Sequence, residues 1–183
     1  EHFPEIPQAM VFDTSFHQTL PEYAWRYALP RKISDQYAIR RYGFHGISHQ
    51  SVVKQAASFL KTPVNKLNLI TIHLGNGASI SAIKKGICVD TTMGMTPLEG
   101  LVMGTRPGDL DPGILTLLAR KGWNQETLET MLNQDSGMKG LCGTNDFREI
   151  LQNKEERNEE AEMALELYCY RVRKTIGSFS TVI

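Results

Sequence analysis

Hydrophobic and polar residues alternate along three consecutive segments in the middle of the chain. The segments are LNLITIHL at 67–74, ASISAIKK at 78–85 and ICVDTTM at 87–93, and the short connections GNG and KG join them. Alternation with a period of two indicates β-strands, and short glycine-containing connections are typical of antiparallel hairpins. The pattern therefore predicts a three-stranded antiparallel meander.

A helical spacing of hydrophobic residues comes before these strands. It predicts a helix over 48–61, with the Ser48 hydroxyl as N-cap and Pro63 beyond its end. Four prolines interrupt residues 1–47, which are expected to be irregular around one short helix over 22–28.

Two helices are expected after the strands. Asp111 is a favourable N-cap and Pro112 fits the first helical position, so a helix should begin there and end at Gly122. Its buried face is expected to consist of Ile114, Leu115 and Leu118. Asn124 should cap the second helix, which ends near residue 136.

The C-terminal part predicts a glycine-rich turn, GMKGLCG, and two more helices. A short helix should run from Thr144 or Asn145 to about Gln152, and a long amphipathic helix from 155 to the end. The apolar stripe of the long helix is Ala161, Ala164, Leu165, Tyr168, Val172, Ile176 and Phe179. Strands together with several helices indicate an α/β fold.

Composition narrows the class of protein. The chain has 183 residues, of which 41% are hydrophobic, and 20 basic residues balance 20 acidic ones. This length supports one globular domain, or one domain and part of another, with a sizeable core. Zero net charge argues against nucleic acid or an anionic membrane as partner. The cysteines Cys88, Cys142 and Cys169 form neither a disulfide framework nor a zinc motif, which favours a cytoplasmic protein.

Glycine-rich segments hold most of the candidate chemistry. Residues 93–111 contain four glycines and two prolines, as expected of a loop that surrounds a ligand. In the turn Gly75-Asn76-Gly77, glycines that allow positive φ could bring backbone N–H groups to a phosphate, and the Asn76 amide could bind it too. The same turn also fits an ordinary hairpin.

One histidine, His45, lies just before the first long helix, and a second, His49, lies in its first turn. His45 stands in YGFHGISH at 42–49 and could donate to an anion that the helix dipole also attracts, or could simply pack in a loop. Zinc binding by His45 and His49 is disfavoured, because His45 precedes the helix and no acidic residue lies between the two.

Three further groups have both a chemical and a structural interpretation. Arg106 could clamp a phosphate or carboxylate, or form an ion pair with Asp109 or Asp111. Asp13 could be an acid, a magnesium ligand or a turn residue. The triplet 146–148 could contact a nucleotide, or be a helix cap and exposed surface. The sequence contains no GxSxG, P-loop or GxGxxG motif, which removes the usual hydrolase and Rossmann interpretations.

Taken together, four ordered motifs resemble the acetate and propionate kinases of the actin-like ATPase superfamily. They are FDTSFHQ at 12–18, YGFHGISH at 42–49, HLGNGAS at 73–79 and DTTMGMTPLEGLVMGTRPGDLDP at 90–112. The resemblance implies an actin-like ATPase (ribonuclease H-like) fold. Pro107 stands where that family commonly has Ser, and Ile47 where Thr is common.

The resemblance also implies roles for individual residues. Asp13 would be the catalytic carboxylate, and His45 and Arg106 would stabilise the phosphoryl group in transfer. Phe44 and Pro97 would line a small apolar pocket for the methyl group of the substrate. The ATP-binding residues would be His73, Leu74, Gly75, Asn76, Gly77, Asp146, Phe147 and Arg148.

The implied activity is reversible transfer of the γ-phosphoryl group of ATP to acetate, or to propionate, giving an acyl phosphate and ADP. Magnesium would be required, with its linked residues outside this chain, and the protein would be a cytoplasmic homodimer paired through its second domain. Two alternatives remain: a propionate or butyrate kinase, and a non-catalytic nucleotide-binding or assembly module. An apolar pocket argues against a sugar acceptor.

The family pattern places this sequence in the middle of a chain about twice as long. Residues 1–18 would then end a first ATPase-fold domain, and residues 19–183 would form most of a second one, truncated at its C-terminal end. An isolated piece of this kind is expected to be inactive, because residues of both domains must meet across the cleft.

Overall fold

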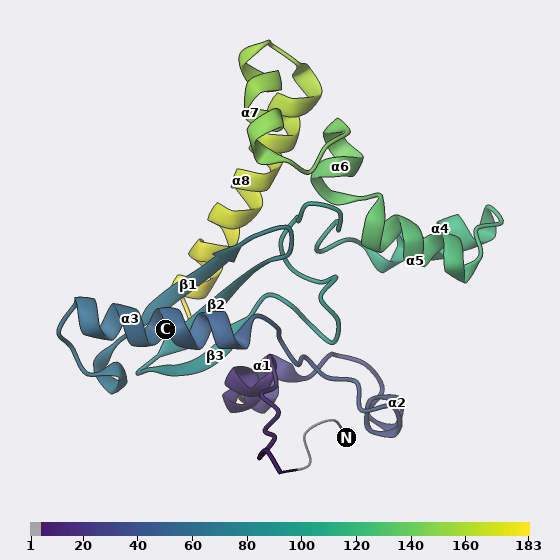
Figure 1. Ribbon diagram of the computed structural model, residues 1–183. Helices are drawn as coiled ribbons and strands as arrows, with labels where there is room; N and C mark the ends of the chain where they lie inside the picture. The colour runs from purple at the N-terminus through teal and green to yellow at the C-terminus, as the bar shows by residue number, and fades with distance from the viewer. Residues whose placement is uncertain (1–4) are drawn as a thin grey trace.

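The computed structural model describes residues 5–183, and its centre is the predicted meander (Figure 1). Strands β1 (Leu69–Leu74), β2 (Ala78–Lys84) and β3 (Ile87–Thr91) form one antiparallel sheet in the order β1-β2-β3. His73 pairs with Ser79 and Thr71 with Ser81 in the register of β1 and β2. The α/β class and the strand order predicted from the sequence are confirmed.

Helices cover both faces of this sheet, so that every residue of β2 except the last is buried. Helix α8 (Glu159–Ser180) lies on one face and α3 (Gly46–Phe59) on the other, together with the 3₁₀ helix η1 (Ser15–Thr19) (Figure 1). The α8 side is apolar, with a cluster that includes Ala78, Ile80, Ala82 and Phe179. The α3 side combines a second cluster of Leu20, Val53, Ile83 and Cys88 with the hydroxyl-bearing and histidine side chains considered below.

The N-terminal part contains more helix than expected. Instead of one helix over 22–28, it has η1, α1 (Glu22–Trp25) and α2 (Arg31–Gln36). Helix α1 is short because Arg26 adopts an extended conformation. Helix α2 is not predicted from the sequence because proline usually interrupts a helix, whereas Pro30 precedes this one at the N-cap position. The expected boundary at residue 18 falls inside η1, and residues 1–4 of the proposed first-domain segment lie outside the described residues.

Helix α3 begins earlier than predicted, at Gly46 rather than Ser48, and ends at Phe59. His45 occupies the N-cap position in the left-handed conformation, with φ 58°. Ser48 is not the cap. Its hydroxyl lies 2.9 Å from His73 Nδ1, so a side-chain contact to the sheet replaces the predicted capping bond. The short 3₁₀ helix η2 (Val64–Lys66) then leads into β1.

The caps of the next two helices are confirmed, but the predicted buried face is wrong. Asp111 caps α4 (Pro112–Arg120), and Asn124 caps α5 (Gln125–Gln134). Ile114 is 45% exposed, and Leu115 and Leu118 are only half-buried. Helix α4 packs against α5, and this pair projects from the rest of the molecule as an arm (Figure 1).

The remaining helices correct two predictions. The expected glycine-rich turn forms α6 (Gly137–Cys142), because Met138 is fully buried and its N–H donates to Met103 O at 2.9 Å. Helix α7 (Phe147–Glu155) is capped by Asp146, not by Thr144 or Asn145.

Helix α8 begins after its cap Asn158 rather than at 155. Its predicted apolar stripe is confirmed, with Ala161, Ala164, Tyr168 and Phe179 buried. None of the helices within residues 5–183 is long and apolar enough to cross a membrane.

Candidate active site

Asp13 organises the start of α3. Its carboxylate accepts a hydrogen bond from the His45 backbone N–H at 2.5 Å and a longer one from Ile47 N–H at 3.4 Å, while its carbonyl accepts from Gly46 N–H at 2.9 Å. These N–H groups are ones that a helix start leaves unpaired, and a carboxylate there is favoured by the helix dipole. Asp13 therefore occupies the place where the sequence suggested that an external anion would bind.

The imidazole of His45 projects from this helix start toward the sheet. Its Nδ1 lies 2.9 Å from Ser79 Oγ, and its ring stacks on His73 with centroids 4.0 Å apart and planes at 21°. Burial, and then the neighbouring His73, lower the pKa of His45 below its usual 6.5; Asp13 opposes this effect and Arg106 adds to it. His45 is therefore a neutral hydrogen-bonding group at pH 7.

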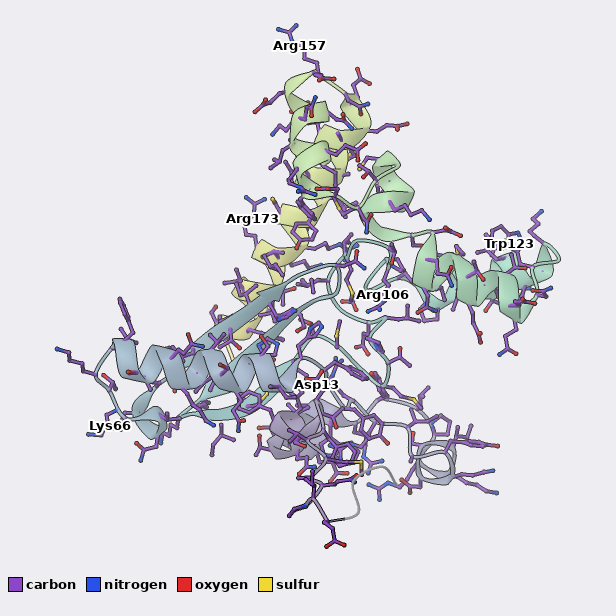
Figure 2. The ribbon with its side chains drawn as sticks, in the orientation of Figure 1. Asp13, Lys66, Arg106, Trp123, Arg157 and Arg173 are labelled. Atoms are coloured by element: carbon purple, nitrogen blue, oxygen red, sulfur yellow. The ribbon has the colours of Figure 1, made fainter. Side chains whose placement is uncertain are left out.

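Arg106 reaches the same place from the long loop, near the centre of the molecule (Figure 2). Its Nη1 donates to Pro97 O at 3.3 Å and contacts Met103 Sδ at 3.9 Å. The ion-pair alternative is wrong for the described part of the chain: Asp109 accepts from Gly100 N–H and Asp111 caps α4. The guanidinium of Arg106 thus keeps donors that no carboxylate of residues 5–183 satisfies.

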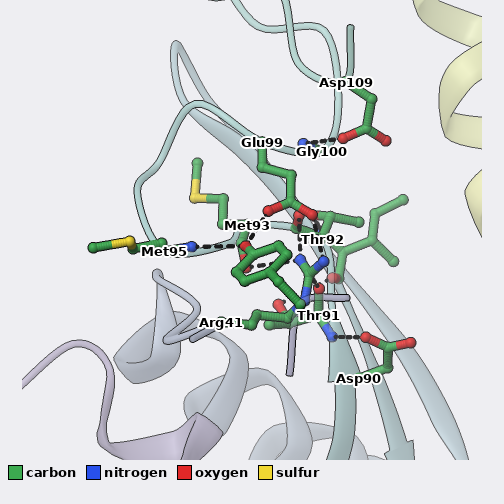
Figure 3. A network of polar contacts seen from close by, with 11 residues as sticks. Arg41, Asp90, Thr91, Thr92, Met93, Met95, Glu99, Gly100 and Asp109 are labelled. Carbon is green, nitrogen blue, oxygen red and sulfur yellow. Dashed lines mark hydrogen bonds and ion pairs between the residues drawn. The ribbon is translucent and has the colours of Figure 1, made fainter. Parts of the chain in front are cut away.

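A separate arginine holds this loop to the sheet (Figure 3). Arg41 Nη1 donates to the carbonyls of Thr91, Thr92 and Met93 at 3.0, 3.0 and 3.2 Å, and its Nη2 pairs with Glu99. The side chain of Arg41 is only 16% exposed, so these contacts are sheltered from water. They fix the loop that carries both Pro97 and Arg106.

The turn Gly75-Asn76-Gly77 lies between these groups. The prediction that its glycines adopt positive φ is wrong, because neither glycine is among the residues with positive φ. The reason for glycine is proximity instead. A Cβ at Gly77 would lie 3.4 Å from the His45 ring and 3.6 Å from Arg106 Nη1, so this backbone position faces both side chains at once.

A hollow of about 380 Å³ extends from the turn to the start of α7. It is lined by Gly75, Asn76, Gly104, Asn145, Asp146, Phe147 and Arg148. Asn76 Oδ1 accepts from Asn145 Nδ2 at 2.8 Å, which leaves the Asn76 amide N–H₂ group for another acceptor. The hollow brings Gly75 and Asn76 together with the triplet 146–148, which the sequence assigned separately to ATP. The other residues assigned to ATP lie outside its lining: His73 stacks on His45, Gly77 faces His45 and Arg106, and Leu74 lies beside α8.

The triplet 146–148 also has structural roles, as its alternative interpretation predicted. Asp146 caps α7 and pairs with Arg148, with Nε and Oδ1 3.0 Å apart, and this hydrogen bonding lowers the pKa of Asp146 to about 2. Phe147 packs edge-to-face on Tyr168 with ring centroids 4.9 Å apart. Arg148 is 91% exposed at the rim of the hollow.

The two expected pocket residues lie beside the two central side chains. Phe44 directly precedes His45, packs against the apolar cluster on the α8 side, and accepts through its carbonyl from His17 Nε2 at 2.9 Å. Pro97 contacts Arg106 through its carbonyl.

Several residues of the site were not assigned a role from the sequence. Ser79 contacts His45, the buried His49 contacts Ser79, and Gly104 and Asn145 help to line the hollow. The alternation of β2 could have indicated Ser79, because it shares a strand face with Ser81. Gly104 and Asn145 meet Asn76 only through tertiary structure, which no local pattern reveals.

Comparison with known proteins agrees with this geometry. The sequence matches the acetokinase family over residues 1–183. It is 54% identical over 182 residues to the acetate kinase of Sulfurovum sp., an alignment that covers 99% of this chain and 46% of the relative. It is 52% identical over 181 residues to the acetate kinase of Campylobacter lari, covering 98% and 46%.

Solved structures that resemble this chain include acetate and propionate kinases as well. The crystal structure of Porphyromonas gingivalis acetate kinase superposes with a TM-score of 0.92 at 45% identity, covering 94% of this chain and 44% of that one. A propionate kinase from Francisella tularensis superposes with a TM-score of 0.95 at 45% identity, covering 100% and 47%. The chain thus spans about half the length of the curated relatives that it matches. It belongs to the acetokinase family.

Proposed function

We propose that this chain supplies one side of the active site of an acetate kinase. The reaction is transfer of the γ-phosphoryl group of ATP to acetate: a carboxylate oxygen forms a bond to phosphorus, the bond to ADP breaks, and ADP leaves with the electron pair. Acetate is already a nucleophile, so this reaction needs alignment and charge stabilisation more than a strong base.

The convergence of His45 and Arg106 on Gly77 carries the proposal. A point at the Cβ position of Gly77 lies 3.4 Å from His45 and 3.6 Å from Arg106 Nη1, so one group near this turn can contact both side chains. Charge spreads over three equatorial oxygens in a phosphoryl transition state. A guanidinium and an imidazole N–H directed at that charge would lower its energy.

The nucleotide is proposed to lie along the hollow beside the turn. Residues His73 to Gly77, and the Asn76 amide in particular, would contact the phosphates. Asp146, Phe147 and Arg148 line the hollow where it reaches α7 and would contact the nucleoside. Support comes from the hollow itself, since residues about seventy positions apart in sequence line it together.

Asp13 is proposed to be a positioning residue rather than a base. Its carboxylate already accepts hydrogen bonds from the backbone of α3, which fixes the direction in which His45 leaves the helix. When bound, magnesium would neutralise phosphate charge. Residues 5–183 contain no group of three or more His, Cys, Asp or Glu side chains able to hold a metal, so no step is assigned to magnesium here.

Acetate is the first choice of substrate because the curated relatives are named acetate kinases. Propionate is the second choice, since one solved neighbour is a propionate kinase. Phe44 and Pro97 would give either substrate an apolar contact.

A hydroxamate assay of a full-length protein that carries this sequence tests the proposal, with ATP and either acetate, propionate or butyrate. Acyl phosphate formation fastest with acetate is the expected result. Binding of ADP with no acyl phosphate from any acid would instead favour the non-catalytic module.

The cellular setting and assembly belong to the same proposal. Three free cysteines support a reducing, cytoplasmic location. A homodimer is supported by apolar side chains left on the surface of α4, where Leu117 is 54% exposed. Light scattering of the full-length protein would give its mass in solution.

A further inference from the structure

His45 is connected to the interior by a chain of hydrogen bonds. Ser79, which is fully buried on β2, places its Oγ 2.9 Å from His45 Nδ1 and 2.8 Å from His49 Nε2. His49, which is 1% exposed on α3, places its Nδ1 2.8 Å from Thr71 Oγ1 on β1. Four side chains from three elements therefore form one relay: Thr71, His49, Ser79 and His45.

The number of protons in this relay is limited. A serine hydroxyl has one proton, so Ser79 can donate to only one of its two imidazoles and must accept from the other. A neutral imidazole carries one N–H, so the nitrogen used at Ser79 decides the state of the opposite nitrogen. The tautomers of His45 and His49 are consequently linked through Ser79.

Two arrangements satisfy the relay. In the first, Thr71 donates to His49 Nδ1, His49 Nε2–H donates to Ser79, and Ser79 donates to His45 Nδ1. His45 then carries its proton on Nε2, the atom that faces Gly77. In the second, each hydrogen bond runs the other way: His45 Nδ1–H donates to Ser79, Ser79 donates to His49 Nε2, and His49 Nδ1–H donates to Thr71. His45 presents an unprotonated Nε2, and the Thr71 hydroxyl is left with Ser81 O at 3.5 Å as its acceptor.

We propose that Ser79, His49 and Thr71 are positioning residues that hold neutral His45 with its proton on Nε2, so that it donates to the transferring phosphoryl group. The inference rests on the proposed function, since that function places an anion at Nε2. The first arrangement gives the Thr71 proton an acceptor at 2.8 Å rather than 3.5 Å. An unprotonated Nε2 would repel phosphoryl oxygens, whereas an N–H attracts them.

A cationic His45 would give a different and measurable result. With protons on both nitrogens, His45 must donate to Ser79, which forces the second arrangement and moves the proton of His49 to Nδ1. Arg106 already supplies a positive charge at the site, and burial with His73 disfavours a second one on His45. A proton on Nε2 of His49 therefore requires neutral His45 protonated on Nε2, whereas a proton on Nδ1 of His49 means that His45 Nδ1 is protonated, either in the cation or in the other neutral tautomer.

Imidazole ¹⁵N NMR of the full-length protein, with labelled histidine, tests the inference. Spectra would be recorded without ligand and with Mg-ADP, aluminium fluoride and acetate as a mimic of the transferring group. We expect protons on Nε2 of both His45 and His49 in the mimic complex. A proton on Nδ1 of His49 in that complex would overturn the inference without any variant being made.

Ser79→Ala provides the second measurement. Loss of the tautomer lock is expected to lower kcat on the order of ten- to a hundredfold, with KM for ATP unchanged and a mixture of His45 tautomers in the spectrum. Ser81→Ala is the matched control, because Ser81 lies two residues further along the same strand face and contacts Thr91 rather than a histidine. Equal losses of kcat in the two variants would contradict the relay.

The outcomes separate this inference from the proposed function. If the protein has acetate kinase activity but the tautomers of His45 and His49 do not change together, the relay is rejected and the proposed function stands. Linked tautomers in a protein that forms no acyl phosphate would reject the proposed function, and with it the phosphoryl group as the acceptor of the His45 proton.

Discussion

The imidazole rings of His45 and His73 are stacked, with centroids 4.0 Å apart and planes inclined by only 21°. Ser48 anchors the outer ring, since its Oγ lies 2.9 Å from His73 Nδ1. A positive charge on one stacked ring disfavours a charge on the other, which adds to the effect of burial on the pKa of His45. The stack therefore fixes the orientation of the His45 ring and favours its neutral form, while Arg106 provides the positive charge of the site.

Arg106→Ala is expected to lower kcat for acyl phosphate formation by about a hundredfold or more, because a cation directed at transition-state charge is lost. The hydroxamate assay measures this loss. Arg120→Ala, on the exposed side of α4, is the control and should leave kcat and the melting temperature unchanged. Full activity of Arg106→Ala in a folded protein would remove Arg106 from the proposed site.

Asn76→Ala is expected to raise KM for ATP about tenfold, the effect of losing one hydrogen bond to a charged group, with a smaller change in kcat. Gly104→Ala should act in the same direction, since its Cβ would lie 1.9 Å from Asn76 Oδ1 and displace that side chain. Asn133→Ala on α5 is the control. Loss of turnover with unchanged nucleotide affinity would contradict a phosphate contact at Asn76.

Gly46→Ala is expected to destabilise the protein by about 1–3 kcal/mol, because its Cβ would lie 2.1 Å from the backbone oxygen of Asp13 and neither backbone can move freely. Gly177→Ala in α8 is the matched control. It meets no atom within 4 Å, and alanine is favoured over glycine in a helix, so it should stabilise by about 0.5–1 kcal/mol. Thermal unfolding of both variants measures the contrast, and similar shifts would show that the close approach is not limiting.

Acidification is expected to destabilise the folded protein through His49. Burial, then the neighbouring histidines, lower the pKa of His49 to about 3, whereas an unfolded histidine titrates near 6.5. Between these values the unfolded chain binds the proton and the folded one does not, so stability falls as pH falls below 6.5. From pH 7 to pH 5 this linkage amounts to about 2 kcal/mol.

His49→Gln tests this linkage, since it removes the titration while retaining an amide in the relay. Urea unfolding at the two pH values should show a smaller loss of stability in the variant than in the unmodified protein. An identical loss in both would assign the acid sensitivity to other groups, such as His17, whose pKa burial also lowers.

Local patterns were sufficient for those elements whose cause is local. The strands follow from alternation, and Asp111 and Asn124 cap helices as their side chains predict. Elements with a tertiary cause were missed. Helix α6 forms in a glycine-rich segment because Met138 is buried and the loop at Met103 and Gly104 binds its first N–H groups.

The same distinction applies to the site: several of its residues could be identified from local motifs, but the contacts between them could not. Asp13, His45 and the turn at Gly77 could be named from sequence because each stands in an unusual motif, and the structure gathers His45, Arg106 and Gly77 into one place. Their contacts could not be predicted. The sequence offered positive φ as the reason for the turn glycines, whereas the structure shows that the space beside Gly77 is occupied by side chains from α3 and the long loop.

One face of strand β2 packs toward α8 and the other toward α3, and the two faces need different side chains. Ala78, Ile80 and Ala82 fill an apolar core, while Ser79 and Ser81 place hydroxyls among polar partners. In a systematic substitution scan of this strand, the kind of substitution that is tolerated should therefore alternate from one residue to the next. On the first face, apolar replacements of similar size should leave the protein folded. On the second face, only replacements that keep the hydrogen bonds of the serine should do so.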